Sequence, residues 1–178
     1  MIIETKNNKQ CFLRKLNPND FDGLSKYLEN LSNETKNRFG PHKFDKQSII
    51  DFYGHSSTNL GYIALNTETK EIVGYSIVKI GYLEHDKHRL ESYGITLDST
   101  TDCTFAPSVA DMWQGCGIGN KLFHFILSDL KTTKIKRVIL WGGVQVDNDR
   151  AVNYYRKNGF KTLGQFTHKG ENYDMILE

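Results

Sequence analysis

The stretch Val109–Phe123, VADMWQGCGIGNKLF, decides the fold because it joins a short apolar segment to the start of an amphipathic one. Gly115, Gly117 and Gly119 stand within five consecutive positions of it, directly before the helix-like run. A glycine-rich turn at the start of a helix forms an anion site, because unpaired N–H groups and the positive end of the helix dipole point at one place. The stretch therefore predicts a binding site for a phosphate or another anion.

Two common phosphate-binding motifs do not fit these glycines. A Walker A loop requires a glycine followed by Lys and then Ser or Thr, but Lys121 follows Asn120 and precedes Leu122. A dinucleotide fingerprint requires the spacing G-x-G-x-x-G. Counted from Gly115, its third glycine falls on Asn120, and counted from Gly117 it falls on Leu122. A nucleotide-binding domain of either kind is therefore disfavoured.

The rest of the chain alternates between short apolar strands and amphipathic helices. Strands are expected at 11–16, 60–66, 71–83, 103–109, 137–144, 160–166 and 172–178. Helices are expected at 17–32, 46–53, 120–133 and 149–159. The run RVILWGGV at 137–144 is almost continuously apolar, which indicates a strand buried on both faces. This order predicts an α+β fold with a mixed, mostly antiparallel sheet.

The composition indicates a globular protein with a core. The 178 residues suit one domain, expected over residues 1–178. A net charge of +2 is too small to favour nucleic-acid binding. No stretch has the apolar region of a signal peptide or the ~20 apolar residues of a membrane helix. Three scattered cysteines and six histidines without metal-ligand spacing predict a cytoplasmic protein with no metal and no membrane association.

Two ordered motifs resemble those of the GNAT superfamily, the GCN5-related N-acetyltransferases. The first is Q-x-x-G-x-G, formed by Gln114, Gly117 and Gly119. The second, in NDRAVNYYRKNGF, is similar to N-x-x-A-x-x-x-Y-x-x-x-G-F and consists of Asn148, Ala151, Tyr155, Gly159 and Phe160. The resemblance covers most of the chain and implies an α/β/α sandwich, the acyl-CoA N-acyltransferase fold. Its sheet would have about six or seven strands, with a splayed and bulged fourth strand.

The resemblance implies acetyl-CoA as the acetyl donor. Glycines without a Cβ let the coenzyme A pyrophosphate approach the chain, and the pantetheine arm is expected alongside the fourth strand, at 103–109. The residues implied in coenzyme A binding are Ser108, Val109, Ala110, Gln114, Gly115, Cys116, Gly117, Ile118, Gly119, Asn120, Asn148 and Tyr155.

Pro107 lies inside the strand that the resemblance makes central. Proline cannot donate to a sheet ladder, so it occurs at edges or bulges, and a bulge is expected at Ala106–Ser108. A family amide near this position polarises the thioester carbonyl. Because Pro107 has no N–H, the donor would be the N–H of Ser108 or of Val109.

The chemistry also requires an acid and a neutral amine. Tyr155 stands where the family tyrosine gives a proton to the leaving coenzyme A thiolate. Several relatives carry a glutamate where this chain has Thr104, which cannot act as a base at neutral pH. Asp102 lies on the same strand face and could act through a water. Glu91 is another candidate, and the amine could also enter in its neutral form.

The expected function is therefore transfer of an acetyl group from acetyl-CoA to a primary amine, by direct attack in a ternary complex. The acceptor could be a small molecule or a protein, and a homodimer is possible. The alternative is a catalytically weak or inactive relative that binds coenzyme A in a regulatory or structural role. A donor with a longer acyl chain is also open.

Overall fold

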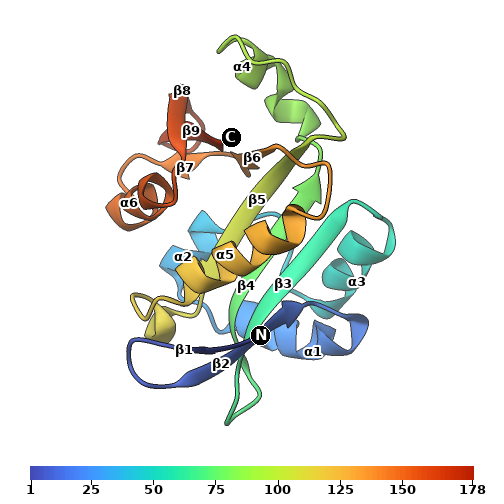
Figure 1. Cartoon of the computed structure of the whole chain (residues 1–178), viewed down its shortest axis with the longest axis vertical. Helices are drawn as coiled ribbons and strands as arrows, with labels where there is room; N and C mark the ends of the chain where they lie inside the picture. The colour runs from blue at the N-terminus through green and yellow to red at the C-terminus, as the bar shows by residue number, and fades with distance from the viewer. The chain divides into compact units, whose positions relative to one another are not determined.

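A computed structural model describes residues 1–178, which form two compact units (Figure 1). The first unit contains Met1–Val78 and Ala106–Leu130, and the second contains Lys79–Phe105 and Lys131–Glu178. The chain therefore passes from one unit to the other three times: inside β4 (Ile72–Ile80), inside β5 (Asp102–Val109) and after Leu130. A single domain over the whole chain stays a prediction.

The first unit is built on strands hydrogen-bonded in the order β1-β2-β3-β4-β5. The three strands that precede β4 are β1 (Ile2–Glu4), β2 (Gln10–Lys15) and β3 (Asn59–Asn66). In β2, Cys11 and Leu13 are buried while Phe12 is exposed, as the period of two along a strand requires. This alternation fixes the antiparallel register in which Leu13 faces Ala64 of β3.

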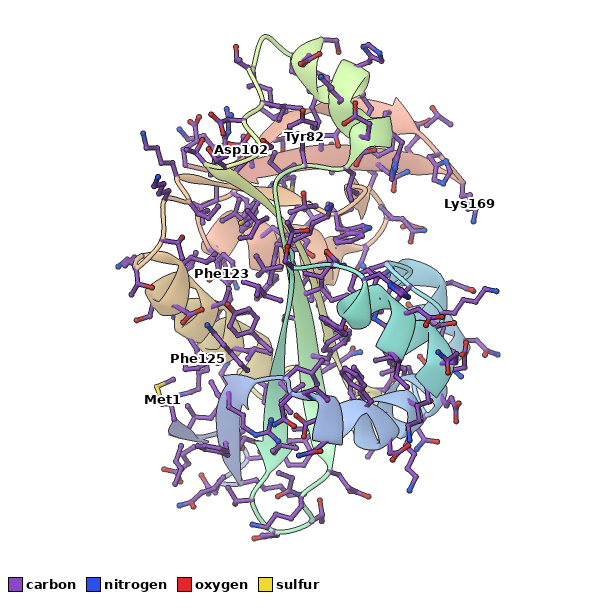
Figure 2. All side chains as sticks on the ribbon, turned by 90° about the vertical axis from the view of Figure 1, so that its right-hand side faces the viewer. Met1, Tyr82, Asp102, Phe123, Phe125 and Lys169 are labelled. Atoms are coloured by element: carbon purple, nitrogen blue, oxygen red, sulfur yellow. The ribbon has the colours of Figure 1, made fainter.

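Helices cover both faces of this part of the sheet. They are α1 (Phe21–Glu29), α2 (Asn33–Arg38), α3 (Lys46–Gly54) and α5 (Ile118–Leu130). Figure 2 shows α5, with the labelled Phe123 and Phe125, on one side of β3 and β4, and α1 and α3 on the other. Two neighbouring residues of β4, Gly74 and Tyr75, face opposite sides of the sheet. A Cβ on Gly74 would lie 3.1 Å from Ile118 of α5, while Tyr75 packs against Phe39, just after α2.

The second unit continues the sheet from the first half of β5. Here β5 runs parallel to β6 (Arg137–Leu140), β6 pairs antiparallel with β9 (Glu171–Leu177), and β9 also pairs with β8 (Lys161–Thr167) and β7 (Val144–Gln145). The remaining helices are α4 (Lys87–Glu91) and α6 (Asp149–Lys157). A small core of Leu90, Ile139 and Ile176 packs inside this unit.

The structure confirms the predicted α+β class and the mixed, mostly antiparallel sheet. It has nine strands rather than six or seven. The short β1 was not expected, and the predicted strand 137–144 is broken into β6 and β7 because Gly142 and Gly143 adopt left-handed φ angles of 64° and 74°. The short helix α2 was not predicted either, because it has no apolar stripe.

Pairing between β5 and β6 ends halfway along β5. The last residue pair is Phe105 with Leu140, and the N–H of Trp141 still donates to the carbonyl of Phe105 at 2.9 Å. The chain then turns away through Gly142. The splaying expected of this strand is therefore visible as an early end to the parallel ladder.

Pro107 lies beyond the part of β5 that pairs with β6, because the last pair of that ladder is Phe105 with Leu140. The N–H that proline lacks therefore costs no hydrogen bond of this ladder. At the end of the strand, Ala110 N–H donates to the carbonyl of Val73 on β4. The bulge expected at 106–108 stays a prediction.

Candidate functional site

The glycine-rich loop connects β5 to α5 through a single 3-10 turn, Asp111–Trp113. Gly115 and Gly117 have φ angles of +79° and +87°, in the left-handed region that other residues rarely adopt. Gly119 lies inside the first turn of α5 without a positive φ angle. Two of the three glycines are thus required by the backbone conformation.

The loop presents backbone donors that have no acceptor in the protein. The N–H groups of Gly117 and Ile118 make no hydrogen bond, and the first turn of α5 carries no acidic residue. A Cβ added to Gly115 would meet no atom within 4 Å, so that side of the loop is open. Cys116, by contrast, already donates its N–H to the carbonyl of Trp113 at 3.4 Å. This arrangement fits a bound diphosphate, which needs donors and close approach to the backbone.

Gln114, expected to bind coenzyme A, ties the middle of the loop to its start at the end of β5. Its side-chain Nε2 donates to the carbonyl of Val109 at 3.2 Å and to the Asp111 carboxylate at 3.4 Å. Asp111 in turn accepts hydrogen bonds from the N–H and hydroxyl of Ser32 and from the hydroxyl of Thr35, at 2.7–2.9 Å, at the start of α2. Gln114 therefore holds the loop in place.

At the end of β5, register decides which backbone N–H groups are available. Ala110 donates its N–H to Val73 of β4. Two residues earlier, Ser108 lies opposite Tyr75 and is directed toward β4, and its hydroxyl reaches the Tyr75 carbonyl at 3.4 Å. Val109 lies between these two positions, so its N–H points away from β4. The sequence left two candidate donors to the thioester carbonyl, the N–H groups of Ser108 and Val109. Of these, the N–H of Val109 is the one that faces outward.

A buried polar network lies beside Ser108 on the α1–α3 face of the sheet. The Ser108 hydroxyl is 3.0 Å from that of Tyr27. The Tyr75 hydroxyl is 2.9 Å from Nε2 of His42 and 2.5 Å from the Tyr53 hydroxyl. Nδ1 of His42 donates to the carbonyl of Lys43 at 2.7 Å, so the neutral ring accepts from Tyr75 at Nε2. Burial lowers the pKa of His42.

No sequence pattern predicted this network. Its members come from α1, β4, β5, α3 and the segment before α3, and no local spacing joins them. The only sequence signal is an excess of aromatic and histidine residues over 39–53, which core packing also explains.

In the second unit, the motif NDRAVNYYRKNGF forms α6 and its caps. Asn148, expected to bind coenzyme A, is the N-cap, and its side-chain oxygen accepts the N–H of Ala151 at 3.2 Å. Gly159 has a φ angle of +88° just beyond the helix end, a conformation that glycine adopts readily. The capping geometry of this helix therefore explains two motif positions without a ligand.

Tyr155 of α6 combines a buried ring with an unpaired hydroxyl. The ring packs edge-on against Tyr154 and Phe160, with centroids 5.1 and 5.4 Å away, and 8% of the residue is exposed. Its hydroxyl makes no hydrogen bond within the chain, and the hydroxyl oxygen is not completely shielded from solvent. Burial raises the pKa of Tyr155, so the hydroxyl keeps its proton at neutral pH. This is the state that a proton donor needs.

Asp102 (labelled in Figure 2) is fully buried and held by a neighbouring arginine. Its two carboxylate oxygens accept Nε and Nη2 of Arg137 at 2.8 and 2.9 Å, and one of them also accepts the N–H of Asp98. Thr104 donates its hydroxyl to the carbonyl of Gly81. Glu91 is exposed on α4. The contacts of Asp102 are those of a structural ion pair, and they argue against the predicted role as a base.

An open mixed sheet with a donor-rich glycine loop before a helix is the acyl-CoA N-acyltransferase fold. The family model "Acetyltransferase (GNAT) family" matches residues 26–160, and the chain belongs to this family. Membership of this family supports the assignment of the protein as an acyltransferase. The family uses acetyl-CoA as its acyl donor. No curated protein matches the chain significantly in sequence.

Solved structures share the fold at low sequence identity. The GNAT domain of PAT from S. lividans is 17% identical, with a TM-score of 0.74 over 99% of this chain and 95% of that one. A chimera of the Vibrio cholerae spermidine N-acetyltransferase SpeG and hSSAT is 20% identical, with a TM-score of 0.65 and 94% of each chain covered. The aminoglycoside acetyltransferase AAC(6')-Ib, in complex with coenzyme A and kanamycin, is 20% identical, with a TM-score of 0.66 over 94% of each chain.

Two further observations concern the chain as a whole. None of its helices is both long and apolar enough to cross a membrane. No three His, Cys, Asp or Glu side chains are grouped as metal ligands would be.

We expect Asp102→Asn to lower the free energy of unfolding by about 3 kcal/mol, because it leaves the largely buried Arg137 without a counter-charge. Urea titration followed by circular dichroism measures the change. Asp147→Asn, an exposed aspartate in the same unit, is the matched control and should stay within about 0.5 kcal/mol of the parent. Unchanged stability together with lost turnover would instead restore Asp102 as a base.

His42 should make stability depend on pH. Because the folded pKa lies below the unfolded value of 6.5, the unfolded state binds more protons, and stability rises with pH across the interval between the two. The contribution is complete above about pH 7 and is lost as pH falls toward the folded pKa. Urea titrations from pH 7.5 to 5 should show a shallower decline for His42→Gln than for the parent. The control is His55→Gln, because the His55 side chain is 83% exposed, and its stability should decline with falling pH as steeply as that of the parent. If stability declines equally in all three proteins, His42 is not the source of the pH dependence.

Proposed function

We propose that the protein transfers the acetyl group of acetyl-CoA to a primary amine. The observation that carries this proposal is the pair of unpaired N–H groups, at Gly117 and Ile118, on a left-handed glycine loop in a chain of this family. Two structural neighbours bear names that refer to amines, spermidine and an aminoglycoside, and this supports an amine as acceptor. Bound acetyl-CoA would supply an activated thioester.

Backbone N–H groups of the loop and of β5 would bind the diphosphate and the thioester carbonyl of acetyl-CoA. The N–H groups of Gly117 and Ile118 would hold the diphosphate, with Gln114 keeping the loop in shape. The outward N–H of Val109 would donate to the thioester carbonyl as negative charge builds on its oxygen. Gly119 and Asn120 belong to the same first turn of α5 and are proposed to line the diphosphate.

Tyr155 is proposed as the proton donor to the leaving thiolate. Its hydroxyl is protonated, unpaired and set in a packed ring environment that restricts its motion. A thiol has a pKa of about 8.5, below that of a tyrosine hydroxyl, so the transfer is uphill and the tyrosinate would regain its proton from solvent. Because Tyr155 has no hydrogen-bond partner to give up, donation breaks no existing bond in the protein.

No strand carboxylate is proposed as the base. Asp102 is engaged by Arg137, and Thr104 is engaged by a backbone carbonyl. An alkylammonium has a pKa near 10.4 and cannot attack, so the amine is proposed to react in its neutral form after losing its proton to solvent. Turnover should then rise with pH toward the pKa of the acceptor.

A panel of primary amines incubated with acetyl-CoA tests the proposal. Release of free thiol should depend on the amine and on enzyme, and should be strongest above pH 8. Calorimetric titration with coenzyme A alone runs in parallel. Coenzyme A binding with no thiol release for any amine would favour the alternative, an inactive relative with a regulatory role. Thiol release only with longer acyl-CoA donors would show that the transferred group is a longer acyl group and not acetyl.

Tyr155→Phe should lower the turnover number by about 10²-fold while the affinity for coenzyme A persists, because only proton donation is removed. Tyr173→Phe, on β9 of the same unit, is the matched control and should keep its turnover. The loss should shrink with an acetyl thioester whose thiol is more acidic, since that thiolate leaves without a proton. An unchanged turnover number in Tyr155→Phe would exclude the role.

A further inference from the structure

The turn between β1 and β2, residues 5–9, docks onto the glycine loop. Lys6 donates its N–H to the carbonyl of Cys116 at 3.0 Å. The turn is fixed internally, because the buried Thr5 hydroxyl reaches the carbonyl of Lys9 at 2.8 Å and accepts the Lys9 N–H at 3.1 Å. The backbone that carries Lys6 is therefore held beside the loop in a defined conformation.

The side chain of Lys6 passes over Gly117. Its Cγ and Cε lie 3.8 and 3.9 Å from the position that a Cβ on Gly117 would take. The ammonium group makes no ion pair or hydrogen bond with the protein. Lys9, from the same turn, is engaged differently, because its ammonium lies 4.9 Å from the ring centre of Trp113.

Two lysines bring positive charge to the start of α5. Lys6 is exposed and its side chain lies over Gly117, and Lys121 stands in the first turn of α5, where the helix dipole favours an anion. No carboxylate of that turn offsets the two lysines. An anion beside Gly117 would neutralise Lys6 and complete the hydrogen bonds of the loop.

We propose that Lys6 binds the diphosphate of coenzyme A, together with the N–H groups of Gly117 and Ile118. This inference rests on the proposed function and adds to it a residue outside the region that matches the family, which begins at residue 26. The diphosphate is favoured over the 3′-phosphate because Lys6 extends over the loop glycine whose N–H is unpaired. Lys6 would thus set the affinity for the donor without taking part in the chemistry.

Calorimetric titrations of Lys6→Met with coenzyme A, dephospho-coenzyme A and pantetheine test the proposal. Affinity for the first two should fall by about tenfold or more and by the same factor, since both carry the diphosphate. Any affinity for pantetheine, which lacks it, should not change. The affinity of the parent should also fall more steeply with salt than that of Lys6→Met.

The control is Lys26→Met, an exposed lysine on α1 that makes the same change in net charge and should bind like the parent. Lys6→Arg should keep most of the affinity for coenzyme A. Binding by this variant would show that a substitution at position 6 does not prevent folding. A loss confined to coenzyme A, with dephospho-coenzyme A unaffected, would place Lys6 on the 3′-phosphate and overturn the proposal. Unchanged affinity in Lys6→Met would overturn it and leave the proposed function intact, whereas a parent protein that binds no coenzyme A would overturn both.

Discussion

Backbone N–H groups without an acceptor are the constraint on which the candidate site depends. A helix must leave its first donors unpaired, and the loop before α5 turns two of them, at Gly117 and Ile118, into a feature that a diphosphate can use. The N–H of Val109 points outward for a different reason, because pairing between β5 and β6 ends at Phe105. The recognition of the donor therefore depends on main-chain geometry more than on particular side chains.

Such donors are useful only if the backbone that carries them is held still. Gln114 spans the loop, and Asp111 fastens it to Ser32 and Thr35 at the start of α2. The N–H of Lys6 also bonds to the loop, at the carbonyl of Cys116. These bonds fix the loop before any ligand arrives, so little conformational freedom remains to be lost on binding.

Several residues that the family motifs single out have structural tasks. Asn148 caps α6, Gly159 ends it, and Gln114 holds the loop. A motif identifies positions that the fold needs as well as positions that contact a ligand, and sequence spacing cannot separate the two. Tyr155 differs from these residues because its hydroxyl is left without a partner inside the chain.

The sequence by itself determined the fold class, most of the strands and longer helices, and the position of the anion-binding loop. It could do so because hydrophobic periodicity and glycine placement act locally along the chain. Only the tertiary structure decided that Asp102 pairs with Arg137, 35 residues away, and that Lys6 reaches Gly117. These outcomes depend on strand register and on turns docked from distant segments, and neither leaves a local pattern that the sequence can show.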